Sequence, residues 1–156
     1  MKNYLKSISI RRFNMLFHRM NVSLPKENEV IILAMPSFEN CFVLKIDDTK
    51  ITKQIIIEQN KITKNQIFEK EVLREKNKNI EGSVLNNFCS KITLLVEEAK
   101  ETHFGGLDGT SYYFITNIEG EIKIGEKWCP DQSSRIGKLL LEIEEEIGID
   151  FFKSYK

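Results

Sequence analysis

Residues 29–57 read EVIILAMPSFENCFVLKIDDTKITKQIII, and this stretch decides the fold class of the chain. It contains three β-branched, apolar runs: Glu29–Met35, Cys41–Ile46 and Ile51–Ile57. Pro36 ends the first run, because proline has no N–H to donate to a neighbouring strand. The segment Asp47–Lys50 is short and polar, as hairpin loops usually are. The pattern therefore predicts an antiparallel meander of at least three strands.

Two amphipathic helices are predicted in the second half of the chain. Val84–Thr102 has one apolar stripe at helical spacing, formed by Leu85, Phe88, Ile92, Val96 and Ala99. Ser83 is the expected N-cap of this helix, and Gly105-Gly106 is the expected stop. A last helix runs from about Ser133 to Ile147, and Gly148 is placed to end it. Its expected inward positions are Ile136, Leu140, Ile143 and Ile147.

A β-hairpin is predicted between these helices. Its arms are Thr110–Thr116 and Glu121–Ile124, and Asn117–Gly120 forms its turn. Gly125–Asp131 is then expected to be a loop, and it carries the single tryptophan, Trp128.

The order of these elements predicts one α+β domain over residues 1–156. Its antiparallel sheet combines the meander with the C-terminal hairpin, and both amphipathic helices pack on one face. Two segments stay open. Residues 1–20 show both strand-like alternation and helical spacing. The charged stretch Lys61–Asn79 holds either an edge strand around Gln66–Val72 or a mobile loop.

The overall charge supports neither of two classes of function, nucleic-acid binding and DNA mimicry. Lysine plus arginine and aspartate plus glutamate number 23 each, so the formal net charge is zero. A general nucleic-acid binder carries a basic excess and a DNA mimic an acidic one, so no nucleic-acid partner is expected. Charge is nevertheless unevenly spread. The first twenty residues are basic, and the last helix carries Glu142, Glu144, Glu145 and Glu146. These segments are either solvated surfaces or a dipolar surface that orients a protein partner.

The three cysteines, Cys41, Cys89 and Cys129, form no CxxC pair and have no histidine-rich surroundings. This spacing predicts no zinc site and no disulfide framework, as is typical of a reducing compartment. No metal or other cofactor is expected. The N-terminal stretch does not read as a signal peptide, and the longest apolar run, Val30–Met35, is too short to span a bilayer. We therefore expect a cytoplasmic protein without a membrane partner.

Two features of the sequence have residue types that catalytic sites use. Gly105–Gly109 lacks both the GxGxxG and the Walker pattern and precedes a strand, so a tight turn is the better interpretation.

Cys89, His103 and Asp108 have the residue types of a catalytic triad, with Cys129 as an alternative nucleophile. The spacing of Cys89 sets it beside the apolar stripe, which is typical of a buried, inert thiol. We therefore expect no enzymatic activity, and a small cysteine hydrolase is the weakest hypothesis.

The segment 104–114, FGGLDGTSYYF, is followed by Gly125–Pro130 and then by Ile136–Leu140. This pattern resembles a group of small uncharacterised bacterial α+β proteins that share a GLDGTxYxF…G…WxP…helix C-terminal half. Met35–Phe38 resembles a second shared element. Cys129 departs from the serine associated with its position, so no chemistry is assigned to that thiol. Proteins of this kind are similar to the small α+β immunity proteins of bacterial toxin systems.

The resemblance implies a non-enzymatic protein-binding domain, most simply an immunity-type inhibitor that neutralises a cognate toxin domain. The alternative is a general adaptor or structural module with another partner. The C-terminal aromatic cluster either covers the core or anchors a partner. The candidate binding residues are Asp108, Trp128, Glu142, Glu145, Phe151 and Phe152. The sequence identifies neither the partner nor the oligomeric state.

Overall fold

A computed structural model describes residues 18, 22–36, 41–63, 66–96, 109–128 and 132–148. For residues 56–63, 66–74 and 128 it describes the backbone alone. The described chain forms six strands and two helices: β1 (Val30–Pro36), β2 (Phe42–Ile46), β3 (Lys50–Thr63), β4 (Gln66–Asn79), α2 (Gly82–Leu95), β5 (Thr110–Ile118), β6 (Glu121–Trp128) and α3 (Arg135–Ile147).

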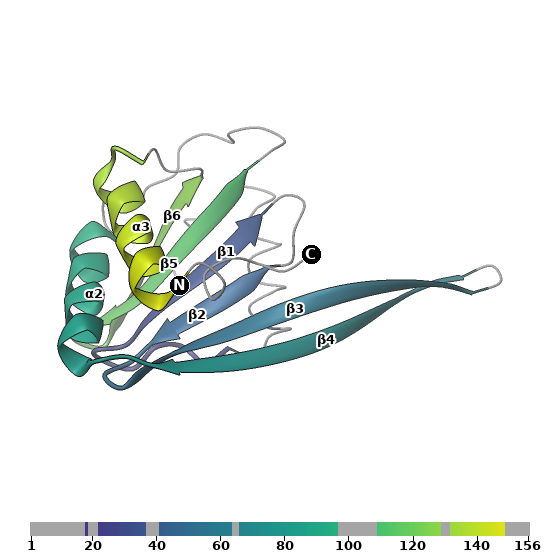
Figure 1. Ribbon diagram of the computed structural model, residues 1–156, viewed down its shortest axis with the longest axis horizontal. Coiled ribbons are helices and arrows are strands. Elements are labelled where there is room, and N and C mark those ends of the chain that lie inside the picture. Colours follow the sequence, from purple (N-terminus) through teal and green to yellow (C-terminus); the bar gives the residue numbers. More distant parts are fainter. Residues whose placement is uncertain are drawn as a thin grey trace.

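The strands form one antiparallel sheet in the order β4-β3-β2-β1-β5-β6 (Figure 1). The α+β fold class predicted from the sequence is thereby confirmed. β1 lies in the middle, where it pairs with β2 from Val30↔Ile46 to Ala34↔Phe42 and with β5 from Val30↔Thr116 to Pro36↔Thr110. The chain therefore inserts β5 beside a strand from its first half, and the two halves share one sheet.

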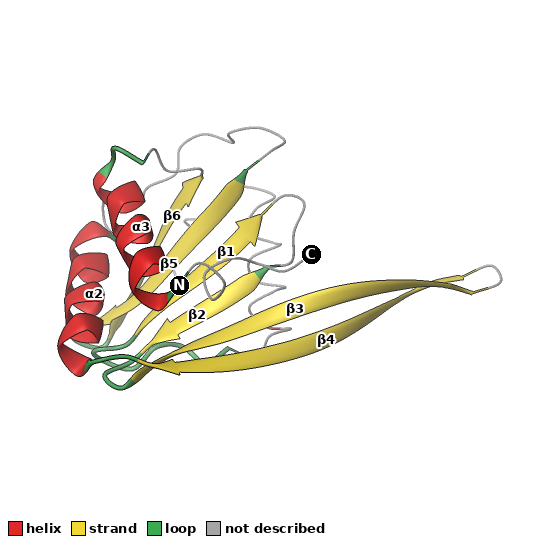
Figure 2. Cartoon of the chain, viewed as in Figure 1, coloured by secondary structure: helices red, strands yellow, loops and turns green. Residues whose placement is uncertain are grey.

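Both faces of β1 are buried, which explains why its sequence is apolar throughout rather than alternating. Val30, Ile32 and Ala34 belong to a core cluster that includes residues of both helices. Ile31, Leu33 and Met35 belong to a smaller cluster on the opposite face, with Val43, Tyr113 and Ile115. α2 and α3 lie together over the first of these faces (Figure 2). We refer to it below as the helix face of the sheet.

The apolar stripes of both helices are buried as their spacing predicts. The side chains of Leu85, Phe88 and Ile92 in α2, and of Val96 at its C-cap, are buried. In α3 the same holds for Ile136, Leu140, Ile143 and Ile147. Each such side chain contributes roughly 1.5–3 kcal/mol relative to an exposed one, so these positions fix how the helices dock on the sheet. Ala99 and Gly105-Gly106 lie outside the described residues.

The helix boundaries differ in part from the prediction. α2 begins at Gly82, so Ser83 lies inside the first turn and is not the N-cap, and Glu81 occupies that position without a side-chain cap. α3 begins at Arg135, and Ser134 caps it by accepting a hydrogen bond at Oγ from the Gly137 N–H at 3.0 Å. Gly148 ends α3 with φ +91°, a conformation that glycine adopts without steric cost.

Two strand predictions were too short. Gly125–Trp128, expected in a loop, continues β6, because β5 supplies ladder partners as far as Ser111↔Trp128. The hairpin of β3 and β4 exceeds its prediction by more. β3 extends to Thr63 and β4 occupies Gln66–Asn79, so most of the stretch left open between an edge strand and a loop is strand.

Candidate protein-binding surfaces

The β3–β4 hairpin extends well beyond the rest of the sheet (Figure 1). β2 pairs with β3 only from Ile51 to Ile55, whereas β3 and β4 pair with each other from Lys50↔Asn79 to Thr63↔Gln66. Within the part of the chain that the structure describes, residues 56–63 and 66–73 therefore form a two-stranded ribbon with no third strand. At about 3.4 Å per residue, its eight residue pairs span roughly 27 Å. We call this part of the hairpin the ribbon.

Side-chain pairs fix the register where the ribbon joins the sheet. Thr52 Oγ1 donates to Asn77 Oδ1 at 2.8 Å, and Gln54 Nε2 donates to Glu75 Oε2 at 3.3 Å. Both bonds join residues that the ladder places opposite each other. Cross-strand pairs of this kind stabilise a sheet by a few tenths of a kcal/mol to about 1 kcal/mol each. They hold the two strands in the register that the ribbon continues.

Lys53 lies on the helix face at the base of the ribbon and is fully buried. Its Nζ lies 4.7 Å from the centre of the Phe42 ring, a cation–π distance. Burial, together with the charge of Lys76 on the opposite strand, lowers the pKa of Lys53 to about 8. The ladder places Lys53 directly across from Lys76, so two cationic residues are held together on this face.

The β3–β4 register separates positive from negative residues by face. Ile51 and Ile55 belong to the helix-face core, so residues in phase with them occupy that face. Those positions hold six basic residues and no acidic one: Lys53, Lys61, Lys70, Arg74, Lys76 and Lys78. The Lys78 ammonium donates to the Ile147 carbonyl at the end of α3, as this assignment requires. The opposite face holds four acidic residues and one lysine: Glu58, Glu69, Glu71, Glu75 and Lys50.

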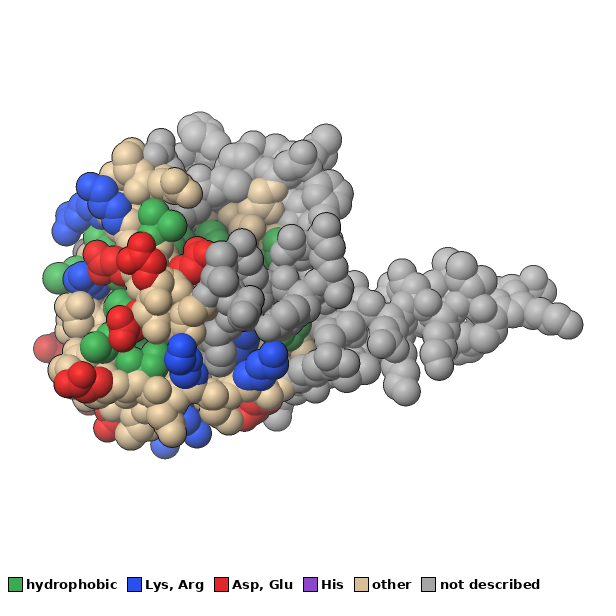
Figure 3. Space-filling view, in the orientation of Figure 1, with side chains coloured by type: hydrophobic (Ala, Val, Ile, Leu, Met, Phe, Trp, Pro, Cys, Tyr) green, Lys and Arg blue, Asp and Glu red, His purple; other side chains and the backbone are tan. Residues whose placement is uncertain are grey.

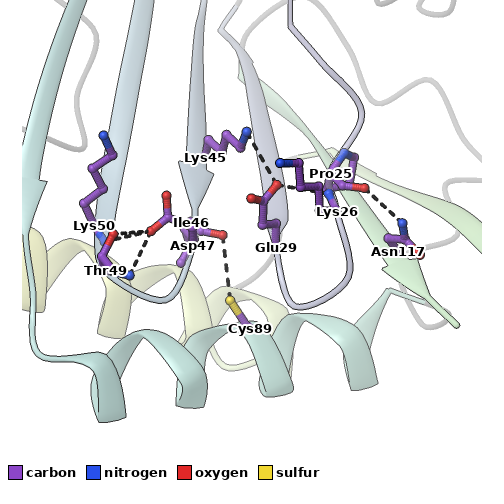
Figure 4. Close-up of polar contacts among 10 residues, drawn as sticks. All are labelled: Pro25, Lys26, Glu29, Lys45, Ile46, Asp47, Thr49, Lys50, Cys89 and Asn117. Atoms are coloured by element: carbon purple, nitrogen blue, oxygen red, sulfur yellow. Dashed lines mark hydrogen bonds and ion pairs between the residues drawn. The ribbon is translucent and has the colours of Figure 1, made fainter. Parts of the chain in front are cut away.

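The turn that leads into β3 is held by Asp47 (Figure 4). Its Oδ1 accepts hydrogen bonds from Thr49 N at 2.8 Å, Thr49 Oγ1 at 2.8 Å and Lys50 N at 3.0 Å. Partial burial acts to raise the pKa of Asp47, but these hydrogen bonds and the Lys50 charge outweigh it and lower the pKa. The carboxylate therefore stays ionised and keeps the turn tight.

Neighbouring polar contacts tie the adjacent loops to the same end of the sheet. Lys45 Nζ lies 3.4 Å from Glu29 Oε2, and Asn117 Nδ2 donates to the Pro25 carbonyl at 3.1 Å (Figure 4). The start of β1 is thus linked to both of its neighbouring strands. This end of the sheet is a fixed base from which the β3–β4 hairpin departs.

Cys89 does not have the environment of a catalytic thiol. It is buried on α2, and its Sγ lies 3.9 Å from the Ile46 carbonyl, which it faces in Figure 4. Burial raises the pKa of Cys89 to about 11, and the carboxylates of Asp47, Glu29 and Asp48 act in the same direction. At neutral pH the group is a thiol rather than the thiolate that nucleophilic chemistry needs. His103, Asp108 and Cys129, the other members of the hypothetical triad, lie outside the described residues.

Glu142 and Glu145, both predicted as binding residues, lie together beside a shallow hollow between α2 and α3. The hollow has a volume of about 370 Å³, and Glu146, Asn87 and Phe88 also line it. Glu142 pairs with Lys91 of α2 at 2.6 Å, but both side chains are well exposed, so the ion pair adds little stability. Acidic side chains gather over the helices in Figure 3. This acidic surface is a second candidate for contact with a partner.

The remaining predicted binding residues are not brought together by the described structure. Trp128 is the last residue of β6, opposite Ser111, and only its backbone is described. Asp108, Phe151 and Phe152 lie outside the described residues. Sequence reasoning missed the ribbon as a site. The sequence does contain an indication of it: acidic and basic residues alternate along Glu69-Lys70-Glu71 and again along Arg74-Glu75-Lys76, so that residues of one charge share a face of a strand.

Comparison of the chain with protein-family models, curated proteins and solved structures finds no match. Within the described ranges, no cluster of three or more histidine, cysteine, aspartate or glutamate residues is arranged to hold a metal ion. The same ranges contain no helix that is both long and apolar enough to cross a membrane. The ribbon and the acidic helix surface are therefore the surfaces on which a functional proposal can be built.

Proposed function

We propose that this protein is a non-enzymatic protein-binding domain that acts in the cytoplasm as an immunity-type inhibitor of a bacterial toxin. In this proposal the ribbon is the principal contact with the toxin. The observation that carries the proposal is the length of the β3–β4 hairpin. Beyond Ile55 the two strands pair, among the described residues, only with each other. An isolated two-stranded hairpin is at best marginally stable in water, so eight extra residue pairs are not explained by the stability of the sheet.

A projecting ribbon suits inhibition by occlusion. It offers backbone edges and two differently charged faces to a partner, while the helices and the rest of the sheet form a rigid base. The resemblance of the C-terminal half to the immunity-like group supports the same function. In this proposal Glu142 and Glu145 form an accessory acidic contact. Trp128, Asp108, Phe151 and Phe152 remain further candidate contacts.

The test compares the full-length protein with a variant in which Ile57 is joined to Val72 by Asn-Gly, which removes residues 58–71. The two-residue turn preserves the Ile57↔Val72 pair and is a favoured hairpin connection, so the rest of the sheet keeps its register. Lys138→Gln, an exposed substitution on α3 outside the proposed contacts, serves as the matched control. Circular dichroism and thermal unfolding establish that all three proteins are folded.

Each tagged protein is used to capture partners from the native host at moderate salt, and captured toxins are then expressed with or without it. We expect the wild type and Lys138→Gln to bind one stoichiometric partner and suppress its toxicity, and the shortened variant to do neither. Equal protection by the shortened variant would show that the ribbon is not the contact. Stoichiometric capture of a non-toxic partner would instead identify a general adaptor.

A further inference from the structure

The outer edge of β4 ends the sheet on one side. In the strand order of the described chain, β4 is terminal, and its only strand partner is β3 over Gln66–Asn79. A terminal strand offers a row of backbone donors and acceptors to any extended chain that aligns with it, so long terminal strands are sites of strand addition or of aggregation. What distinguishes this edge is the order of its charges.

The residues of β4 alternate in sign with the pleat. Positions 70, 74, 76 and 78 are basic and lie on the helix face, whereas positions 69, 71 and 75 are acidic and lie on the other face. In an antiparallel pair, directly opposite residues share a face of the sheet. Among the charged positions of β4, a strand added to it therefore meets only basic residues on the helix face and only acidic residues on the other face.

This pattern excludes a second copy of the same strand. Two copies of β4 related by a two-fold axis keep their faces, because the axis is perpendicular to the sheet. Basic positions then meet basic positions and acidic positions meet acidic positions, as in Lys70 against Arg74 or Glu69 against Glu75. Like charges directly opposite each other destabilise strand pairing. The charges of the edge thus disfavour self-association and favour a strand of the opposite pattern.

We propose that β4 binds an extended segment of a partner protein by antiparallel strand addition, and that this segment alternates acidic residues toward the helix face with basic residues toward the other. The inference rests on the proposed function, since it specifies how the hairpin recognises its partner. Five charged contacts, opposite Lys70, Glu71, Arg74, Glu75 and Lys76, define the required sequence. Two apolar positions, opposite Val72 and Leu73, separate them.

The test uses synthetic peptides and the full-length, isotope-labelled protein. Read from the residue opposite Lys78 to the residue opposite Lys70, the complementary peptide is Glu-Thr-Glu-Lys-Glu-Ile-Val-Lys-Glu. A peptide of the same composition with its alternation scrambled has the same net charge and serves as the control. Amide chemical shifts and amide exchange rates of β4 are followed during titration at low salt.

We expect the complementary peptide to bind at least about tenfold more tightly than the scrambled peptide, with shifts and exchange protection concentrated in β4. Raising the salt from about 0.05 M to 0.5 M reduces the difference, because exposed charge pairs are screened. The charge-reversed variant (Lys70→Glu, Glu71→Lys, Arg74→Glu, Glu75→Lys, Lys76→Glu) should instead prefer the peptide Glu-Thr-Lys-Glu-Lys-Ile-Val-Glu-Lys, which inverts the signs opposite the five changed residues and keeps Glu opposite the unchanged Lys78. Where that variant does not fold, the comparison of the two peptides on the wild type decides.

Equal affinity for the complementary and scrambled peptides, or no binding of either, would overturn the proposal. Tighter binding of a single-stranded oligothymidine than of the complementary peptide would also overturn it and would assign the basic residues to nucleic acid. These outcomes are separable from failure of the proposed function. The shortened variant can lose the partner while the full-length protein binds both peptides equally. That result would mean that the partner contacts the ribbon but does not add a strand to β4.

Discussion

Replacing Lys53 by methionine removes a buried charge at the base of the ribbon and keeps a flexible, unbranched side chain of similar length. Lys53 is fully buried, and its pKa is lowered from the ordinary 10.5 to about 8. Each unit of pKa corresponds to about 1.4 kcal/mol, so holding this ammonium in the fold costs about 3 kcal/mol. This magnitude predicts how the stability of the protein depends on pH.

Between about pH 8 and pH 10.5 the unfolded chain binds a proton at Lys53 that the folded chain has already released. The free energy of unfolding of the wild type therefore receives a contribution that rises with pH across this window. Below about pH 8 both states are protonated, and the cost is constant. We expect Lys53→Met to be more stable than the wild type at pH 7, and this advantage to shrink by about 3 kcal/mol by pH 10.5.

Urea unfolding followed by circular dichroism at pH 7, 8, 9 and 10 measures this change. In the wild type, the titration of Cys89 changes stability with pH in the opposite direction to that of Lys53. Its raised pKa means that the folded state keeps a proton that the unfolded state loses between about pH 9 and pH 11, so stability falls there. Taking the difference between the wild type and Lys53→Met cancels that contribution. Leu94→Met, on the exposed surface of α2, is the matched control and should show a difference that is flat with pH, because neither side chain titrates.

A difference between the wild type and Lys53→Met that stays constant within about 0.5 kcal/mol from pH 7 to pH 10 would refute the reasoning, because that value is far below the linkage expected from the shifted pKa. It would show that Lys53 is solvated in the folded protein. The strand register that places it across from Lys76 would then need revision. The experiment therefore also checks the assignment of basic residues to the helix face.

Three further predictions concern stability and are checked by the same urea unfolding at pH 7. Thr116→Val should raise the free energy of unfolding by about 1 kcal/mol, because Thr116 Oγ1 is buried and has no hydrogen-bond partner in the described part of the chain; a loss of stability would show that the hydroxyl is satisfied. Ile143→Ala should cost about 2–5 kcal/mol, whereas Leu141→Ala, on a side chain that is 36% exposed, should cost less than about 1 kcal/mol; similar costs would contradict the docking of α3. Ser134→Ala should cost about 1 kcal/mol through loss of the cap on α3, and an unchanged midpoint would mean that the cap does not form in solution.

The helices and the central strands could be predicted because their signal is apolar and periodic. Leu85, Phe88 and Ile92 repeat at helical spacing, and the runs within residues 29–57 are continuous and β-branched. Each pattern has one simple way to bury its apolar side chains, so local sequence and tertiary packing agree.

The long hairpin and the end of β6 could not be predicted in the same way. The stretch 61–79 is rich in lysine and asparagine, residues that strands generally disfavour, and it forms a strand through its ladder with β3. Trp128 similarly depends on a partner in β5. The sequence alone named Glu142 and Glu145, which do lie beside one hollow, but it did not find the charge separation, since that depends on knowing which residues stand opposite each other.

The central position of β1 has a consequence for how the chain emerges from a ribosome. β1 is complete early, and β2 can cover one of its edges soon afterwards. The other edge belongs to β5, which is synthesised roughly eighty residues later, so this pairing carries a high contact order. At a rate of synthesis of about 5–20 residues per second, that edge and its apolar side chains stay unpaired for several seconds. During that interval the nascent chain is a substrate for holdase chaperones, and the insertion of β5 is the step that ends its dependence on them.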